Sequence, residues 1–281
     1  MSTPRTLTLP RGVEATGIET PVGTFAAHVV RAASNDGSSN PHVLLIPGWT
    51  GSKEDFTPLL PPLAAAGFDA TAYDQRGQFE TQGGAHPDYS LDGFASDALA
   101  VAAACSVEPS HLLGHSFGGL VAQQAVLAEP PGWRSLSLLD TGPGALGETP
   151  GRPLRMLVDA LGVTPMADIH RFREQAIGVK RRPDIAEFLL RRFTSNDPMS
   201  LKAMTQALID APDRIDEIAS LSLPVWVGRG ADDDAWPHDT QAAMAERLGT
   251  EIHVIADSAH SPAVENTQGL ADVWLPFLAS A

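Results

Sequence analysis

The stretch LLGHSFGGL, residues 112–120, carries one serine among three glycines, directly after an apolar run and before a helical pattern. Glycine loses more conformational entropy on folding than other residues, so this cluster needs a geometric reason. In a G-x-S-x-G pattern between a strand and a helix, the reason is a sharp, strained turn that holds the serine hydroxyl above the sheet. We therefore predict that Ser116 lies at such a turn, beside helix amides that favour developing negative charge. The alternative is an ordinary Ser-Gly turn that caps a helix.

Short apolar runs and helical patterns alternate along the chain, which is typical of a mostly parallel sheet with helices on both faces. Apolar runs that predict buried strands lie at residues 43–48, 68–74, 111–116, 135–140, 223–228 and 251–256. Helices are predicted at 52–67, from the cap residue Ser90 onward, and at 117–129. Residues 6–9 and 24–31 look like short strands that would add antiparallel edges. The predicted fold class is α/β, with a central sheet of about eight strands.

The alternation stops between residues 148 and 220, where only helical patterns occur. This segment separates the sixth predicted strand from the next one in the core. We therefore expect about four helices, inserted as a cap over the carboxyl ends of the strands. The expected division is a core domain of residues 1–147 and 221–281, with a helical cap of residues 148–220.

Charge and cysteine content limit the partners and the compartment. The formal net charge is −15, and an acidic surface repels nucleic acid and anionic membranes, so we expect neither as a partner. The single cysteine, Cys105, cannot form an internal disulfide and lies in an apolar stretch. The amino-terminal residues lack the apolar core of a secretory signal, and no apolar run reaches membrane-spanning length. We expect a cytoplasmic protein, of an oligomeric state that the sequence does not indicate.

Five stretches together resemble the α/β-hydrolase family, and the resemblance covers nearly the whole chain. Beside the serine turn, LLIPGWTGSKEDF (44–56) resembles the segment that supplies an oxyanion donor, and YDQRG (73–77) resembles the end of the following strand. GRGADDDAWP (228–237) resembles the acid loop, and DSAHSP (257–262) the histidine loop. The order serine, acid, histidine also matches this family. The resemblance implies a serine hydrolase with a Ser-Asp-His triad and neither metal nor cofactor.

The base of such a triad is a neutral imidazole, which suits proton transfer near pH 7. Of the nine histidines, the family geometry selects His260, which lies in a loop between the last strand and the final helix. His115 neighbours the serine, but we expect its side chain to point away from Ser116.

The acid has two candidate positions. The family spacing between Gly230 and Pro237 selects Asp233, the middle one of three consecutive aspartates. Asp140, at the end of the preceding strand, competes with it because some relatives carry their acid there. In either case the carboxylate would fix the imidazole tautomer and stabilise its charged form.

The resemblance also implies that the backbone amides of Trp49 and Phe117 hold the oxyanion. This chain has Pro47-Gly48 where the family usually has His-Gly. Since the expected donor is the amide of Trp49, we expect the change to alter how the loop is braced, not to remove the oxyanion site. In YDQRG, Asp74 and Arg76 are interpreted as a structural turn and ion pair.

The expected reaction is acyl transfer to Ser116, followed by hydrolysis, on a small apolar ester, thioester, lactone or amide. The cap residues expected to form its core or line an apolar pocket are Leu154, Met156, Leu157, Phe172 and Phe188. The basic clusters KRRPD and LLRRF are interpreted as solvated faces and salt bridges, with carboxylate binding by one arginine as a minor alternative. This scaffold leaves other functions open. They are hydrolysis of a carbon–carbon bond, acyl transfer or cyclisation, perhydrolysis, and the binding of a ligand without catalysis by a receptor-like protein.

Overall fold

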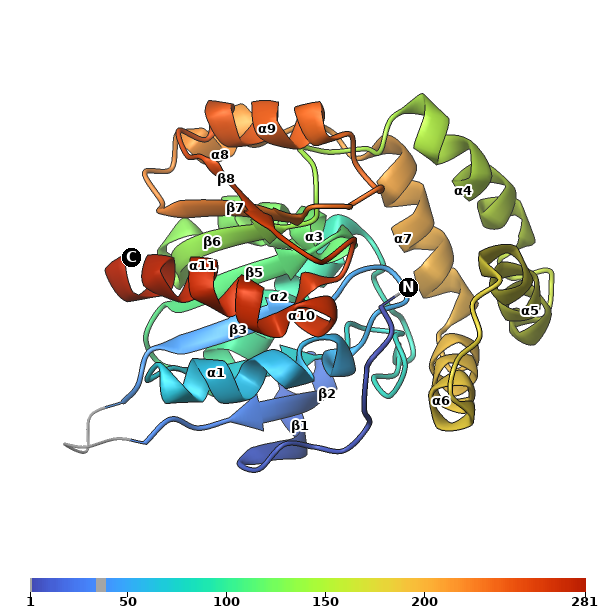
Figure 1. The fold of residues 1–281 in the computed structure, drawn as a ribbon, viewed down its shortest axis with the longest axis horizontal. Coiled ribbons are helices and arrows are strands. Elements are labelled where there is room, and N and C mark those ends of the chain that lie inside the picture. Colours follow the sequence, from blue (N-terminus) through green and yellow to red (C-terminus); the bar gives the residue numbers. More distant parts are fainter. Residues whose placement is uncertain (1, 34–38) are drawn as a thin grey trace.

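One eight-stranded sheet runs through the computed structural model of the protein, which describes residues 2–33 and 39–281 and only the backbone of 148–152 (Figure 1). The strands are β1 (Val13–Thr20), β2 (Gly23–Val30), β3 (His42–Ile46), β4 (Asp69–Tyr73), β5 (Ser110–His115), β6 (Trp133–Leu139), β7 (Val225–Gly230) and β8 (Ile252–Ile255). Their order is β1-β2-β4-β3-β5-β6-β7-β8. β3 to β8 are parallel to one another, as predicted, and β1 and β2 pair in antiparallel fashion at one edge.

The prediction of a strand at residues 6–9 is wrong. The first strand is β1, which pairs with β2 along its whole length. Of its eight residues only Val13 is buried, because an edge strand with a solvated face needs no apolar run. The other strands are predicted from continuous apolar runs, and β1 has no such run.

Helices cover both faces of the sheet and connect its parallel strands along the chain. They are α1 (Leu60–Ala65), α2 (Leu91–Cys105), α3 (Phe117–Ala128), α4 (Glu148–Ala160), α5 (Met166–Ile177), α6 (Pro183–Thr194), α7 (Pro198–Asp210), α8 (Ile215–Ala219), α9 (His238–Arg247), α10 (Pro262–Glu265) and α11 (Thr267–Ser280). α2 begins as predicted, because the Ser90 side chain accepts a hydrogen bond from the Gly93 amide.

The single helix predicted for residues 52–67 is wrong. This segment forms two short 3₁₀ turns, Lys53–Asp55 and Thr57–Leu59, before α1 begins at Leu60. Pro58, Pro61 and Pro62 explain the break, because proline lacks the amide hydrogen that a helix interior requires. Each of these prolines stands in the first turn of its helix, where the missing amide hydrogen costs least.

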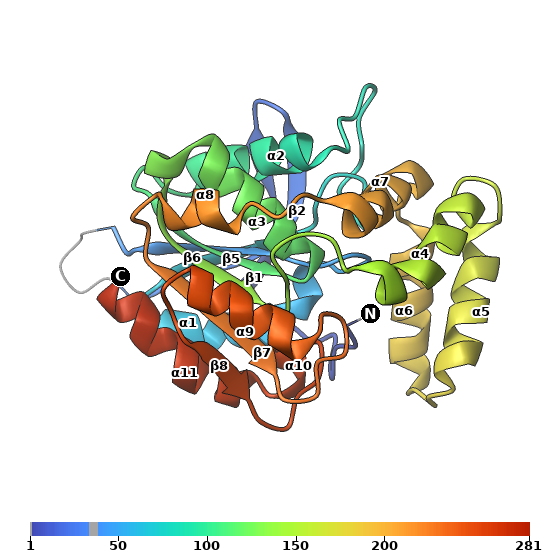
Figure 2. The same ribbon diagram turned by 90° about the horizontal axis from the view of Figure 1, so that it is seen from above.

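Two apolar layers hold the helices on the sheet. Leu44, Leu112 and Leu138 face one layer, which includes side chains of α2, α3, α8 and α9. The alternate residues Val43 and Leu113 face the other, which includes α1, α10 and α11. Figure 2 shows this arrangement from above, with α2 and α3 on one side of the sheet and α1 and α11 on the other. Both faces are buried, which is why these strands are continuous apolar runs.

The segment between β6 and β7 contains helices and no strand within the described residues, as predicted. α4 packs against α7 and α5 against α6, whereas α8 packs against α3 and α9. α4 to α7 lie together beyond one end of the sheet in both views (Figures 1 and 2). Among the described residues, no helix combines the length and the apolar character needed to cross a bilayer.

Candidate active site

Ser116 lies on a strained turn between β5 and α3. Its backbone has φ +56° and ψ −122°, a conformation that costs free energy for a residue with a side chain. Two glycines permit the turn: a Cβ on Gly114 would lie 2.2 Å from the Gly118 oxygen, and one on Gly118 would lie 2.4 Å from the Ile46 oxygen. The glycines therefore allow backbone segments to approach where no side chain fits, as the sequence pattern predicts.

A chain of hydrogen bonds joins three side chains from three loops. The Ser116 Oγ lies 2.9 Å from His260 Nε2, and His260 Nδ1 lies 2.7 Å from Asp233 Oδ1. Ser116 follows β5, Asp233 follows β7 and His260 follows β8. The structure thus brings together the serine, the histidine and the first of the two candidate acids.

Asp233 is held as an anion by its hydrogen-bond donors. Its side chain is fully buried, and burial by itself would raise its pKa. Hydrogen bonds from His260, from the Ala235 amide and from Gln241 Nε2 outweigh burial and lower the pKa of Asp233 to about 2. Because one oxygen accepts from His260 and the other from Gln241, the carboxylate has a fixed orientation.

Asp140, the competing acid, lies beside Asp233 but is in a different state. Its Oδ1 accepts a hydrogen bond of 2.8 Å from the Gly230 amide, and its Oδ2 has no partner among the described residues. Burial, and then the negative charge of Asp233, raise the pKa of Asp140 well above its ordinary value. The two neighbouring acids thus have pKa values shifted in opposite directions, upward for Asp140 and downward for Asp233.

Asp140, Asp233 and His260 also form the one group of described side chains close enough together to hold a metal ion, with one ligand atom each within 4.8 Å of the others. His260 Nδ1, however, is already hydrogen-bonded to Asp233 Oδ1. The same atoms therefore serve an acid–base arrangement.

His115 was expected to point away from the serine, but it lines the same pocket. Its Nε2 lies 2.5 Å from the backbone oxygen of His260, and the two imidazole centroids are 5.0 Å apart. Burial, and then the nearby His260, lower the pKa of His115 to about 3, so the ring is neutral. A neutral ring that donates from Nε2 to the His260 carbonyl braces the histidine loop.

Two backbone amides lie free beside the serine. Within the described residues, neither Trp49 nor Phe117 donates a hydrogen bond from its amide. The loop that carries Trp49 is close to the serine, because a Cβ on Gly48 would lie 2.9 Å from Ser116 Cβ. The amide of Phe117 is the first of α3. Both positions suit donors to an oxyanion.

A small pocket of about 150 Å³ opens onto Ser116 and His260. Most of its remaining wall is apolar and comes from Trp49, from Trp236 and from residues between β6 and β7, namely Leu146, Leu154 and Leu208. Of the cap residues singled out in the sequence, Leu154 lines this pocket. Met156, Leu157 and Phe172 line a neighbouring hollow instead, and Phe188 packs against Phe79.

The YDQRG motif is structural, although Asp74 and Arg76 do not pair with each other. Asp74 accepts from the buried Lys53 side chain at 2.9 Å and from its amide at 2.7 Å, whereas Arg76 pairs with Asp97. Burial raises the pKa of Asp74 to about 7 in spite of the Lys53 charge. These ion pairs fix the loops after β3 and β4.

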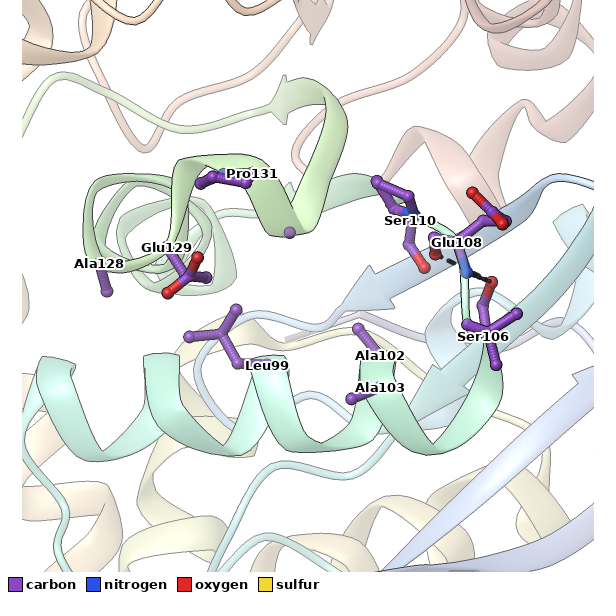
Figure 3. A pocket seen from close by; sticks show the side chains of 12 residues that line it. Leu99, Ala102, Ala103, Ser106, Glu108, Ser110, Ala128, Glu129 and Pro131 are labelled. Atoms are coloured by element: carbon purple, nitrogen blue, oxygen red, sulfur yellow. Dashed lines mark hydrogen bonds between the residues drawn. The ribbon is translucent and has the colours of Figure 1, made fainter.

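A separate hollow of about 490 Å³ lies at the opposite end of the sheet, between α2 and the turn after α3 (Figure 3). The Ser106 hydroxyl there donates to the Glu108 oxygen at 2.9 Å. Among the described residues that line this hollow, none is a histidine, cysteine, lysine or arginine. It therefore lacks the imidazole that completes a Ser-His-Asp arrangement.

The chain matches the model of the "Alpha/beta hydrolase family" over residues 43–273. It is 28% identical over 249 residues to a pimeloyl-[acyl-carrier protein] methyl ester esterase of Aeromonas hydrophila, which covers 85% of this chain and 95% of that protein. An esterase of the same name from Aeromonas salmonicida is 31% identical over 203 residues, or 68% and 77% of the two chains. A thermophilic esterase from Thermogutta terrifontis shares the fold, with a TM-score of 0.73 and 20% identity over 95% of this chain and 98% of that one.

Proposed function

The chain belongs to the alpha/beta hydrolase family, and we propose that it is a serine hydrolase that cleaves a small carboxylic ester through an acyl-enzyme on Ser116. The observation that carries this proposal is the chain of hydrogen bonds from Asp233 through His260 to Ser116, which ends at a small apolar pocket. The named activity of the Aeromonas relatives, hydrolysis of a methyl ester, supports an ester with a small alcohol as the substrate.

In the first step, the Ser116 oxygen attacks the ester carbonyl while His260 Nε2 takes the hydroxyl proton. The carboxylate of Asp233 accepts a hydrogen bond of 2.7 Å from the Nδ1–H group of His260, which fixes the tautomer and stabilises the imidazolium. Since its hydrogen-bond donors outweigh burial and keep Asp233 ionised, this role is available across the whole neutral range of pH.

The negative charge that develops on the carbonyl oxygen is received by the free amides of Trp49 and Phe117. Removal of one such donor typically costs on the order of 3 kcal/mol of transition-state stabilisation. His260 then gives its proton to the leaving alcohol, and a water that it activates releases the acid from Ser116. Neither step requires a metal or cofactor.

We propose that α4 to α7 act as a cap that limits the size of the substrate. Leu154 on α4 and Leu208 on α7 line the pocket together with the core residue Trp236. Residues from both sides of the proposed core–cap division thus surround the reacting carbonyl. Bulky groups on both sides of an ester would not fit into this volume.

A fluorophosphonate probe tests the proposal. We expect the wild-type protein to be labelled, and we expect Ser116→Ala and His260→Ala to lose the label while they keep the wild-type melting temperature. A folded wild-type protein that resists labelling would contradict the proposal and favour a ligand-binding protein on this scaffold. Product analysis with methyl esters then separates hydrolysis, which gives the free acid, from acyl transfer to another alcohol or amine.

A further inference from the structure

A second hollow, of about 470 Å³, lies next to the catalytic pocket. Trp49 and Leu154 line both spaces, so the two share a wall. The rest of the second hollow is formed by α4, by α5 and by the loop between them, and its lining is largely apolar: Pro153, Met156, Leu157, Ala160, Ile169 and Phe172. A substrate that extends from Ser116 past Trp49 would enter this hollow.

Arg173 on α5 is the one charged side chain among the described residues that line the second hollow. Its guanidinium carbon lies 4.5 Å from the Trp49 ring centroid and 5.4 Å from that of Phe193. It makes no hydrogen bond or ion pair with any described residue, and its Nη1 is buried without a partner. Burial lowers the pKa of Arg173 to about 10, so the group is still charged at neutral pH.

The neighbouring arginines are in a different situation. Arg192, on α6, pairs with buried Asp55 at 2.7 Å, and Arg181 pairs with Glu174 at 2.6 Å. The chain has 34 acidic and 19 basic residues, yet none of the described acidic residues pairs with Arg173. The acidic residue that stabilises the charge of Arg173 is Glu174, which raises its pKa, but Glu174 makes its ion pair with Arg181. A partly buried charge without a hydrogen-bonded partner of its own is costly.

Trp49 provides a second donor without an acceptor. Its indole Nε1 is buried and has no hydrogen-bond partner among the described residues. A buried donor without a hydrogen-bond partner needs an explanation. Arg173 and Trp49 each carry such a donor, stack against each other and line the same hollow.

We propose that this hollow is the subsite for the far end of the substrate, where Arg173 binds a carboxylate carried on an apolar chain. The inference rests on the proposed function, because it places the ester at Ser116 and the acid end beyond Trp49. The apolar lining accommodates the methylene groups, and the guanidinium matches the planar carboxylate with two parallel donors. The preferred substrate class is then the half-ester of a dicarboxylic acid.

The test compares esters that differ only in charge at the far end. Methyl hexanoate and monomethyl adipate have the same chain length, and monomethyl half-esters of four to eight carbons measure the span from Ser116 to Arg173. We expect the wild-type enzyme to have a KM for its best half-ester at least tenfold below that for the neutral ester of equal length. A charge-assisted hydrogen bond of ordinary strength gives about that ratio.

In Arg173→Met the KM for the half-ester should rise to that for the neutral ester, so that the tenfold preference is lost, and kcat should be nearly unchanged. The reason is that the variant keeps the apolar stem of the side chain and removes its charge. Arg173→Lys should keep part of the preference, since it retains a charge without the fork. The control is Arg171→Met on the same helix, where an exposed arginine pairs with Asp168. It should leave both KM values unchanged.

Binding measured without turnover separates this inference from the proposed function. Calorimetry with Ser116→Ala should detect monomethyl adipate more tightly than methyl hexanoate, and Arg173→Met on that background should remove the difference. If half-esters bind preferentially but are not hydrolysed by the wild type, the proposed function fails and the subsite stands. Two results would overturn the subsite. One is a wild-type enzyme that hydrolyses neutral esters and half-esters of every length equally well. The other is an Arg173→Met variant whose activity falls equally for both classes of ester.

Discussion

The loops after β6 and β7 each place an aspartate at the active site, and the pKa values of the two aspartates are shifted in opposite directions. Asp140 and Asp233 are both buried, and their strands are hydrogen-bonded neighbours. Asp140 accepts one backbone amide and its pKa is raised, whereas Asp233 accepts from His260, Gln241 and the Ala235 amide and its pKa is lowered. Hydrogen-bond donors outweigh burial at Asp233 and do not at Asp140, so the number and kind of donors distinguish the two carboxyls.

This difference assigns separate roles to the two acids. The ionised Asp233 can stabilise a charged imidazole, whereas a protonated Asp140 can only donate a hydrogen bond to Asp233. Adjacent buried carboxyls are expected to share one negative charge between them. Substitutions that remove one acid at a time therefore have unequal effects.

Asp233→Asn should have the largest effect. An asparagine in this place favours the wrong tautomer of His260 and cannot stabilise its positive charge, so we expect kcat to fall by about 10⁴-fold. Steady-state hydrolysis of a methyl ester measures the loss. Asp234→Asn, an exposed neighbour in the same loop, is the control and should retain wild-type activity. A mild effect of Asp233→Asn would mean that Asp140 takes over as the acid.

Gln241→Leu should have an intermediate effect, because it removes the hydrogen bond of 2.8 Å to Asp233 Oδ2 and leaves the bond from His260 in place. A hydrogen bond to a charged group contributes roughly 1.5–3 kcal/mol, so we expect kcat to fall by about ten- to a hundredfold. The same substitution at Gln268, which donates to Asp272 on the exposed face of α11, should not change kcat. Equal rates for wild type and Gln241→Leu would contradict the view that donors orient Asp233.

The sequence predicts the serine turn well because its requirements are local. Gly114 and Gly118 are needed where backbones meet, and the strand before and the helix after them follow from apolar periodicity. The choice between Asp140 and Asp233 is not local. It depends on Gln241 and on the Gly230 amide, whose contacts with the two carboxyls form only when the strands assemble.

Other contacts around the site are not local either. His115 alternates away from the serine along β5, but its Nε2 contacts the backbone oxygen of His260 in the loop after β8, and no pattern near residue 115 indicates that contact. The unpaired state of Arg173 likewise depends on which acidic residues lie near it in space. Sequence patterns identify the residues that supply the chemistry better than they identify the residues that orient them.

Asp140→Asn should have only a small effect on activity. Asparagine has nearly the shape of a protonated aspartate, can accept from the Gly230 amide and can donate to Asp233. We expect kcat to change by less than about threefold, which is under roughly 1 kcal/mol. A loss comparable to that of Asp233→Asn would show that Asp140 is needed as an anion.

The pH dependence of the free energy of unfolding tests the smallest expected difference between Asp140 and Asp233. The pKa of Asp140 is raised on folding, so between the unfolded value of about 3.9 and the folded value the native state binds the extra proton. The wild-type protein therefore loses free energy of unfolding as pH rises above 4, with a slope of up to about 1.4 kcal/mol per pH unit for one group. Asp140→Asn has no such proton to hold. Its stability relative to wild type should increase from pH 4 toward pH 8.

Urea unfolding of both proteins across this range measures the difference, with Asp234→Asn as the control that should run parallel to wild type. The sign is diagnostic, because an ionised Asp140 with a lowered pKa would reverse it. In that case Asp140→Asn would be less stable than the wild type at every pH above 4, and the difference in their free energies of unfolding would not decrease as pH rises. An increasing relative stability of Asp140→Asn, together with nearly unchanged kcat, would establish that one of two adjacent acids is kept neutral so that the other can hold the charge.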